Sequence, residues 1–271
     1  MTQQTPKATS LRVGVLLIPP AQLLDASPID LFGMLTPTYL QSCGLPQPLL
    51  DLAIDVSIHY ISASGPDTRA PMTSSATLPV TDGLDSPAVQ PGKLDTLLIP
   101  GPDPNLVPDQ TALDFIRAHR NAATTDFLVI CTGSFPAGHA GLLDGKRVTG
   151  PRGLLPKLKE KFPAAKFVDR RWESDGRLWT CGGITNGLDL TAAYLHYKVQ
   201  KELANLVCAM AEVGDRPQEY DTSRTSSTLW FVWLIIKSLV KGGNKGKSSG
   251  SSSSSTSGLN NTDKHKSKKA V

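Results

Sequence analysis

The sequence has few of the features that indicate a secreted protein, a membrane protein or a metal-binding protein. Its 271 residues include only four cysteines, with no C-x-x-C pair and no zinc-ligand spacing, so we expect neither disulfides nor a metal site. No stretch approaches the roughly 18–20 apolar residues that span a bilayer. Residues 1–10 lack the apolar run of a secretory signal. These absences predict a cytoplasmic protein with free thiols.

Positive charge is also scarce on the part of the chain that can fold. The whole chain has a formal charge of +4, but residues 237–271 contain eight lysines and one acid, Asp263, and so carry +7. Residues 1–236 are left with −3. Nucleic-acid-binding proteins usually cluster basic residues on the folded domain. The sequence therefore predicts no nucleic-acid partner.

What the sequence does contain is an alternation of strand-like and helix-like segments. Continuous apolar runs such as LRVGVLLI (11–18) are typical of strands buried on both faces of a sheet. Alternating strands and helices imply a mainly parallel sheet, so the fold class is α/β. We expect strands at 11–18, 54–62, 94–100 and 126–131, a hairpin within 166–181, and helices from Ser27-Pro28 to Leu40, from Asp109 to His119 and over 184–212.

The end of the chain has a different composition. Residues 11–212 are predicted to form one domain, and residues 213–241 a linker with a short apolar segment. Residues 242–271 are Ser, Gly and Lys-rich and are predicted to be disordered. The apolar segment 229–240 is too short to span a bilayer. It fits weak peripheral contact with an anionic membrane, or docking on the body or on a partner copy, and the sequence does not decide between them.

Cys131 stands where a buried strand turns into a segment of small residues, VICTGS. This resembles a nucleophile elbow with cysteine in place of serine. A thiol at a helix N-terminus is stabilised as thiolate, with a pKa lowered from about 8.5 to roughly 3.5–7.5. The alternative is a buried structural cysteine at the end of a strand.

Two acids follow the first strand, in the loop PPAQLLDASPIDLFG. Asp25 lies just ahead of the expected helix, and Asp30 lies inside it. Ligands of parallel α/β sheets bind beyond the carboxyl ends of the strands, so an acid here can face the thiol. Each acid also has an ordinary structural explanation, as a helix cap for Asp25 and as a first-turn acid for Asp30.

Taken together and in order, these segments resemble the DJ-1/PfpI family of the class I glutamine-amidotransferase-like superfamily. The matching stretches are LRVGVLLIPPAQLLDASPIDLFG, LDTLLIPGPDPN, VICTGSFPAGHAGLLDGKRVTG and GRLWTCGGITNGLDLTAAYL. Among its members, the isonitrile-hydratase-like ones have the most similar first loop. The resemblance implies a flavodoxin-like three-layer sandwich and Cys131 as the reactive thiolate. It also implies that Asp25 is hydrogen-bonded to that thiol, and it suggests a homodimer.

The sequence departs from the family pattern at two functional positions. Many relatives have a histidine soon after the K-R-V-T strand, but here RVTGPRG has none before His196. The usual P-G-G also becomes Pro100-Gly101-Pro102, and proline offers no N–H to an oxyanion. Backbone N–H groups of Gly101 and Thr132 remain as candidate oxyanion donors. Both departures make a protease or amidase less favoured than a hydratase.

Three other candidate residues have ordinary explanations. His119 is expected to be a solvated cation at a helix C-terminus. His139 lies two helical turns from Cys131, too far for proton transfer. Cys181 is expected to be a packed structural thiol.

The leading functional hypothesis is therefore a hydratase that uses Cys131 on a small electrophile, as isonitrile-hydratase-like relatives do, and needs no cofactor. The alternatives are a glyoxalase-like enzyme and a non-enzymatic sensor in which Cys131 is oxidised reversibly.

Overall fold

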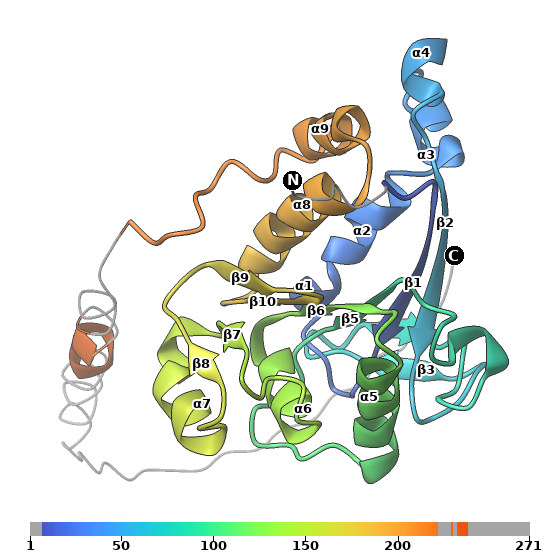
Figure 1. Cartoon of the computed structure of the whole chain (residues 1–271). Coiled ribbons are helices and arrows are strands. Elements are labelled where there is room, and N and C mark those ends of the chain that lie inside the picture. The colour runs from blue at the N-terminus through green and yellow to red at the C-terminus, as the bar shows by residue number, and fades with distance from the viewer. Residues whose placement is uncertain (1–6, 222–228, 230–231, 238–271) are drawn as a thin grey trace, which may run out of the picture. The chain divides into compact units, whose positions relative to one another are not determined.

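Six strands form the central sheet, in the order β2-β1-β5-β6-β10-β9 (Figure 1). Neighbouring strands run parallel except β9, which forms an antiparallel hairpin with β10. The computed structural model describes residues 7–221, 229 and 232–237. The strands of the sheet are β1 (Ser10–Leu16), β2 (Asp55–Ile61), β5 (Thr96–Ile99), β6 (Asp126–Val129), β9 (Trp172–Asp175) and β10 (Leu178–Cys181).

Helices cover both faces of this sheet, which makes three layers (Figure 1). Alternate residues of a strand face opposite sides, so Leu98 and Leu128 enter one core while Leu97 and Phe127 enter the other. The helices are α1 (Leu23–Ala26), α2 (Pro28–Gly33), α3 (Pro37–Ser42), α4 (Gln47–Leu50), α5 (Gln110–Ala122), α6 (Ser134–His139), α7 (Leu155–Lys161), α8 (Asn186–Lys198) and α9 (Lys201–Met210). The predicted α/β class with a mainly parallel sheet is confirmed.

Two predicted helices are each split in two. The helix expected from Ser27 to Leu40 ends at Gly33 and restarts as α3, because Thr36 precedes a proline and is extended. Ser27 is itself helical and makes no side-chain cap. The segment expected to be one helix over 184–212 breaks at extended Val199, which separates α8 from α9.

Shorter elements complete the fold. Small sheets are formed by β3 (Arg69–Pro71) with β4 (Thr77–Pro79) and by β7 (Arg147–Val148) with β8 (Lys166–Phe167). The 3₁₀ turns are η1 (Pro87–Val89), η2 (Cys131–Gly133) and η3 (Arg152–Leu154).

The chain divides into two compact units, Met1–Arg224 and Thr225–Val271. Residues 213–221, which the composition assigns to a linker, make several contacts with the folded unit. The predicted disordered tail, 242–271, lies outside the described residues. Within the described part of the chain, no helix is long and apolar enough to cross a membrane.

Candidate functional site

Cys131 sits in a strained turn directly after β6. Its φ is +55°, a left-handed conformation that costs a non-glycine residue of order 1–3 kcal/mol. The turn also brings the backbone against the neighbouring strand, because a Cβ on Gly133 would come within 2.3 Å of the Ile99 carbonyl oxygen. The sequence C-T-G therefore builds a sharp elbow that presents the thiol at the carboxyl end of the sheet.

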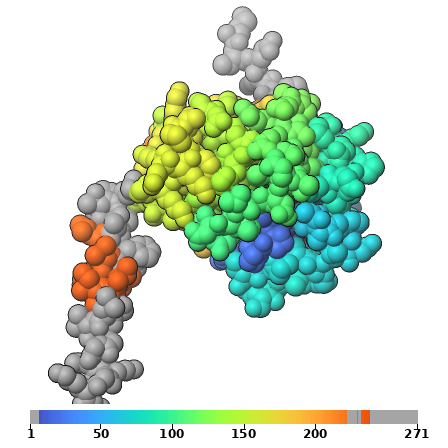
Figure 2. All heavy atoms as spheres, turned by 90° about the horizontal axis from the view of Figure 1, so that it is seen from below, coloured from blue at the N-terminus to red at the C-terminus, as the bar shows by residue number. Residues whose placement is uncertain are grey.

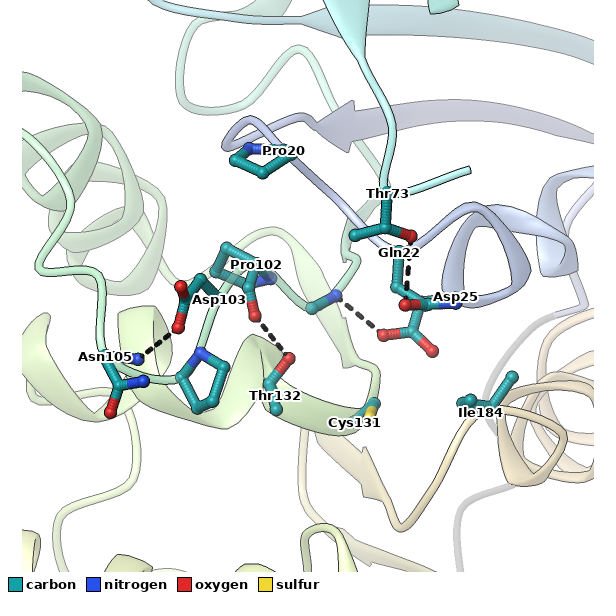
Figure 3. Close-up of a pocket in the computed structure, with 12 residues that line it drawn as sticks. Pro20, Gln22, Asp25, Thr73, Pro102, Asp103, Asn105, Cys131, Thr132 and Ile184 are labelled. Carbon is teal, nitrogen blue, oxygen red and sulfur yellow. Dashed lines mark hydrogen bonds between the residues drawn. The ribbon is translucent and has the colours of Figure 1, made fainter. Parts of the chain in front are cut away.

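Asp25, on α1, brings a wholly buried carboxyl group to the same place. The backbone N–H of Gly101 donates to its Oδ2 at 3.0 Å. Oδ1 has no hydrogen-bond partner among the described residues by distance and angle. Figure 3 shows the free side of this carboxyl directed toward the space beside Cys131 and Ile184. The acid is thus held by one oxygen and available through the other.

Gly101 has to be a glycine for this arrangement to exist. A Cβ at that position would lie 2.6 Å from Oδ2 of Asp25 and 2.2 Å from Oγ1 of Thr132. No side chain can enter that space without displacing the acid or the elbow. The glycine after β5 therefore serves the close approach of three loops.

Burial changes the acidity of the Asp25 carboxyl. Desolvation raises its pKa to about 7, although the hydrogen bond from the Gly101 N–H and the nearby Cys131 thiol act in the opposite direction. An acid with a pKa near neutrality can both accept and release a proton at physiological pH.

The Cys131 thiol is shifted in the direction opposite to the one the sequence predicts. Burial first, and then the negative charge of Asp25, raise its pKa to about 11, while N–H groups of Ile184 and Thr132 limit the rise. The helix that follows the elbow has only six residues, and its dipole does not offset burial beside a carboxylate. The expectation of a standing thiolate is wrong. Between these two pKa values, thiol and carboxylate together hold one proton.

The pair opens into a pocket of about 480 Å³. In the space-filling view, the blue N-terminal segment comes to the surface between cyan and green segments (Figure 2). Of the described residues that line the pocket, none is a histidine, lysine or arginine, and the acids are Asp25 and Asp103. Such a lining favours small neutral molecules over anions. The lining residues are Pro20, Gln22, Asp25, Thr73, Gly101, Pro102, Asp103, Pro104, Asn105, Cys131, Thr132 and Ile184.

The two candidate oxyanion donors are both engaged within the protein. The Gly101 N–H binds Asp25, and the Thr132 N–H interacts with the Cys131 sulfur. The Thr132 hydroxyl donates to the Pro102 carbonyl at 2.7 Å. Their oxyanion role stays a prediction. The resting arrangement leaves neither N–H free for a tetrahedral acyl intermediate.

Three residues at the site carried no clear signal in the sequence. The Gln22 N–H donates to the Gly101 carbonyl at 2.9 Å, and its side-chain oxygen accepts from the Thr73 hydroxyl at 3.1 Å (Figure 3). Thr73 lies between β3 and β4, and Ile184 lies in the turn after β10. Of these three residues, Gln22 alone was indicated by the sequence, because it lies close to Asp25 in the first loop.

The remaining candidates do not line the pocket. Asp30 is exposed on α2. Cys181 is wholly buried, as expected of a packed thiol, and its sulfur interacts with the backbone N–H of Cys131. His139 packs edge-on against Phe162, with ring centroids 5.3 Å apart. Across residues 7–221, 229 and 232–237, no group of three His, Cys, Asp or Glu could hold a metal ion.

The prediction of a solvated His119 is wrong. Its side chain is completely buried, with Nδ1 3.0 Å from the Thr125 hydroxyl and Nε2 2.9 Å from the Val89 carbonyl. His119 does lie in the last turn of α5, but its side chain faces the core and not the solvent.

Comparison with known proteins places these features in context. The sequence profile of the DJ-1/PfpI family matches residues 43–197. An isonitrile hydratase from Pseudomonas putida is 34% identical over 217 residues, which is 77% of this chain and 81% of that protein.

Solved structures share the fold. A THiJ/PfpI family protein from Pseudomonas syringae superposes with a TM-score of 0.61 at 17% identity, covering 87% of this chain and 90% of the other. DJ-1beta from Drosophila melanogaster gives 0.59 at 17% identity, covering 75% and 98%.

Proposed function

Because this chain belongs to the DJ-1/PfpI family, we propose that it hydrates small neutral isonitriles, R–NC, to N-substituted formamides. Cys131 is the nucleophile and Asp25 the proton carrier. The observation that supports this most directly is the buried pair itself, a thiol and a carboxyl that share one proton in a pocket whose described lining includes no histidine. The similar Pseudomonas putida protein is an isonitrile hydratase, in accord with the proposal.

The first half of the reaction joins the substrate to the thiol. The Asp25 carboxylate accepts the thiol proton as the sulfur forms a bond to the terminal carbon of R–NC. The protonated Asp25 then delivers that proton to the same carbon. The product is a thioimidate, R–N=CH–S–Cys131, and Asp25 is again a carboxylate. The raised pKa values suit this exchange. Near neutral pH the thiol keeps its proton until it attacks, and the Asp25 carboxylate can accept that proton and release it again.

The second half releases the product. Water adds to the thioimidate carbon as Asp25 accepts one of its protons, and Asp25 passes that proton to the imine nitrogen. The carbon–sulfur bond then breaks while Asp25 accepts the remaining hydroxyl proton, and R–NH–CHO leaves. Asp25 returns this second proton to the sulfur, so one water is consumed and the pair returns to its starting state. The addition requires no oxyanion hole, which agrees with the engaged N–H groups of Gly101 and Thr132.

A direct assay tests the proposal. The full-length protein is incubated with a neutral alkyl isonitrile, and the formyl proton of the product is followed by NMR. We expect turnover by the native protein and none by Cys131→Ala. Cys43→Ala is the matched control, because Cys43 is an exposed thiol outside the pocket. Native protein that forms no formamide contradicts the proposal.

The alternative function, an oxidation sensor, requires Cys131 to be a thiolate at neutral pH. Peroxide reacts with thiolate, and a pKa raised to about 11 leaves little thiolate at neutral pH. Peroxide titration with intact-mass analysis separates the two functions. Rapid oxidation of Cys131 without isonitrile or methylglyoxal turnover would favour the sensor.

A further inference from the structure

Residues 216–221, here named the strap, fold back beside the hairpin of β9 and β10. The N–H of Arg171 donates to the carbonyl of Gln218 at 2.8 Å, and the side-chain amide of Gln218 donates to the Trp172 carbonyl at 3.0 Å. Ion pairs link Arg170 to Glu219 and Arg171 to Asp221. The strap is therefore attached to the folded unit by backbone and side-chain bonds.

Tyr220 is the residue of the strap that reaches inward. Two guanidinium groups lie close to its ring, that of Arg152 at 4.1 Å and that of Arg171 at 4.8 Å from the ring centroid. Its hydroxyl accepts a hydrogen bond from the Asn186 side-chain amide at 2.9 Å. A Cβ on Gly182 would lie 2.6 Å from this hydroxyl, so the approach depends on a glycine there.

Asn186 and Gly182 flank the turn that contacts the reactive sulfur. Ile184, between them, lines the pocket, and its backbone N–H interacts with the sulfur of Cys131. Arg216, also in the strap, donates to the Thr185 carbonyl at 2.8 Å. The same arginine pairs with Asp189, a buried carboxylate on α8. The strap thus binds this turn at Thr185 and Asn186, the two residues that follow Ile184.

We propose that Tyr220 is a positioning residue for Cys131. By binding Asn186 beside Gly182, it keeps the Ile184 N–H against the sulfur and so stabilises the thiolate when it forms. The inference rests on Cys131 being the reactive group of the proposed function. It gives Tyr220, a residue outside the predicted domain 11–212, a role at the site.

The test uses full-length Tyr220→Phe, which keeps the ring close to Arg152 and Arg171 and removes only the hydroxyl. The readout is the pH dependence of Cys131 alkylation by iodoacetamide, followed by peptide mass. Loss of one donor to the sulfur should raise the midpoint by about half a unit to one unit. The alkylation rate at pH 8 should fall by about threefold to tenfold.

Glu219→Gln is the matched control, because it removes an ion pair of the same strap that does not contact the turn. We expect its midpoint to equal that of the native protein. A Tyr220→Phe midpoint equal to the native one overturns the inference, whether or not its melting temperature changes. Alkylation requires no turnover, so a failure of the isonitrile assay leaves this result interpretable.

Discussion

His119 and Asp25 are both ionisable and both completely buried, yet their surroundings differ in one respect. Both ring nitrogens of His119 have hydrogen-bond partners, whereas one oxygen of Asp25 has none among the described residues. A fully bonded buried group contributes to stability. A buried polar atom without a partner costs stability, and such a cost is retained where it serves chemistry. The comparison separates a structural residue from a functional one.

The largest expected effect is on turnover. Asp25→Asn keeps the size of the side chain and an acceptor for the Gly101 N–H but cannot carry a proton. We expect kcat/KM for an isonitrile to fall by about 10²–10⁴-fold. His119→Gln should change kcat/KM by less than about twofold, because His119 does not line the pocket. Equal losses of kcat/KM in Asp25→Asn and His119→Gln would contradict the assignment of Asp25 as functional and His119 as structural.

The next effect is on the free energy of unfolding, which we expect to rise when the Asp25 carboxyl is removed. Folding raises the pKa of Asp25 to about 7, so ionisation opposes folding as pH rises from about 4 through 7. Asp25→Asn should therefore stabilise the protein at pH 8 by up to about 4 kcal/mol, with little effect near pH 4. Urea unfolding at both pH values measures this difference. A destabilised variant at pH 8 would contradict the origin we assign to the shift.

A substitution of His119 should instead lower the free energy of unfolding. His119→Ala leaves the Val89 carbonyl and the Thr125 hydroxyl each without their ring partner and removes a ring packed on Phe115. We expect a loss of about 2–4 kcal/mol at pH 8. Burial lowers the pKa of His119, so protonation opposes folding of the native protein as pH falls below about 6.5. The variant should therefore lose less at pH 5 than at pH 8, as urea unfolding would show.

A smaller effect is expected in the pH profile of kcat/KM, which should change by about tenfold per pH unit on its acid side. The reactive form of the pair holds one proton, and it is depleted below the pKa of Asp25, about 7. The kcat/KM value should rise with pH below that midpoint and reach a plateau above it. A profile that is flat between pH 5 and 8 would show that Asp25 does not carry the proton.

The smallest effect concerns exposed apolar side chains near the end of the described chain. In the described residues 229 and 232–237, the side chains of Leu229, Trp233 and Ile236 are more than half exposed. With the lysine-rich sequence that follows, this segment fits weak binding to anionic lipid. We expect partial, salt-sensitive flotation of the full-length protein with anionic vesicles. Trp233→Ser should reduce it by a few-fold. No flotation at low salt would rule this contact out.

The sequence predicts the fold and the position of Cys131 because both depend on local patterns. Apolar runs indicate the buried strands, and the VICTGS segment indicates that Cys131 lies at a turn after a strand. Asp25 was singled out by the family resemblance, because Asp25 and Asp30 each have an ordinary local explanation. The split of the first helix follows from a local rule that the prediction of a single helix left out, since Pro37 restricts Thr36.

The errors concern contacts between distant segments. The raised pKa of Cys131 depends on burial and on a carboxylate 106 positions earlier, and no spacing rule reveals either. His119 was expected to be solvated because it stands near the end of a helix, yet its side chain is buried and its partners are Val89 and Thr125. Tyr220 lay in a polar stretch whose composition resembles a linker, and only the folded chain shows its contact with Asn186.

The left-handed conformation of Cys131 has a consequence for protein engineering. Glycine adopts a φ of +55° without strain, so Cys131→Gly would relieve part of the elbow's conformational cost while removing the nucleophile. In a library selected only for thermal robustness or expression, variants at this position would drift toward glycine and lose activity. In a library selected for turnover, cysteine would be kept at a lower melting temperature. Position 131 would therefore show which pressure had acted on the population.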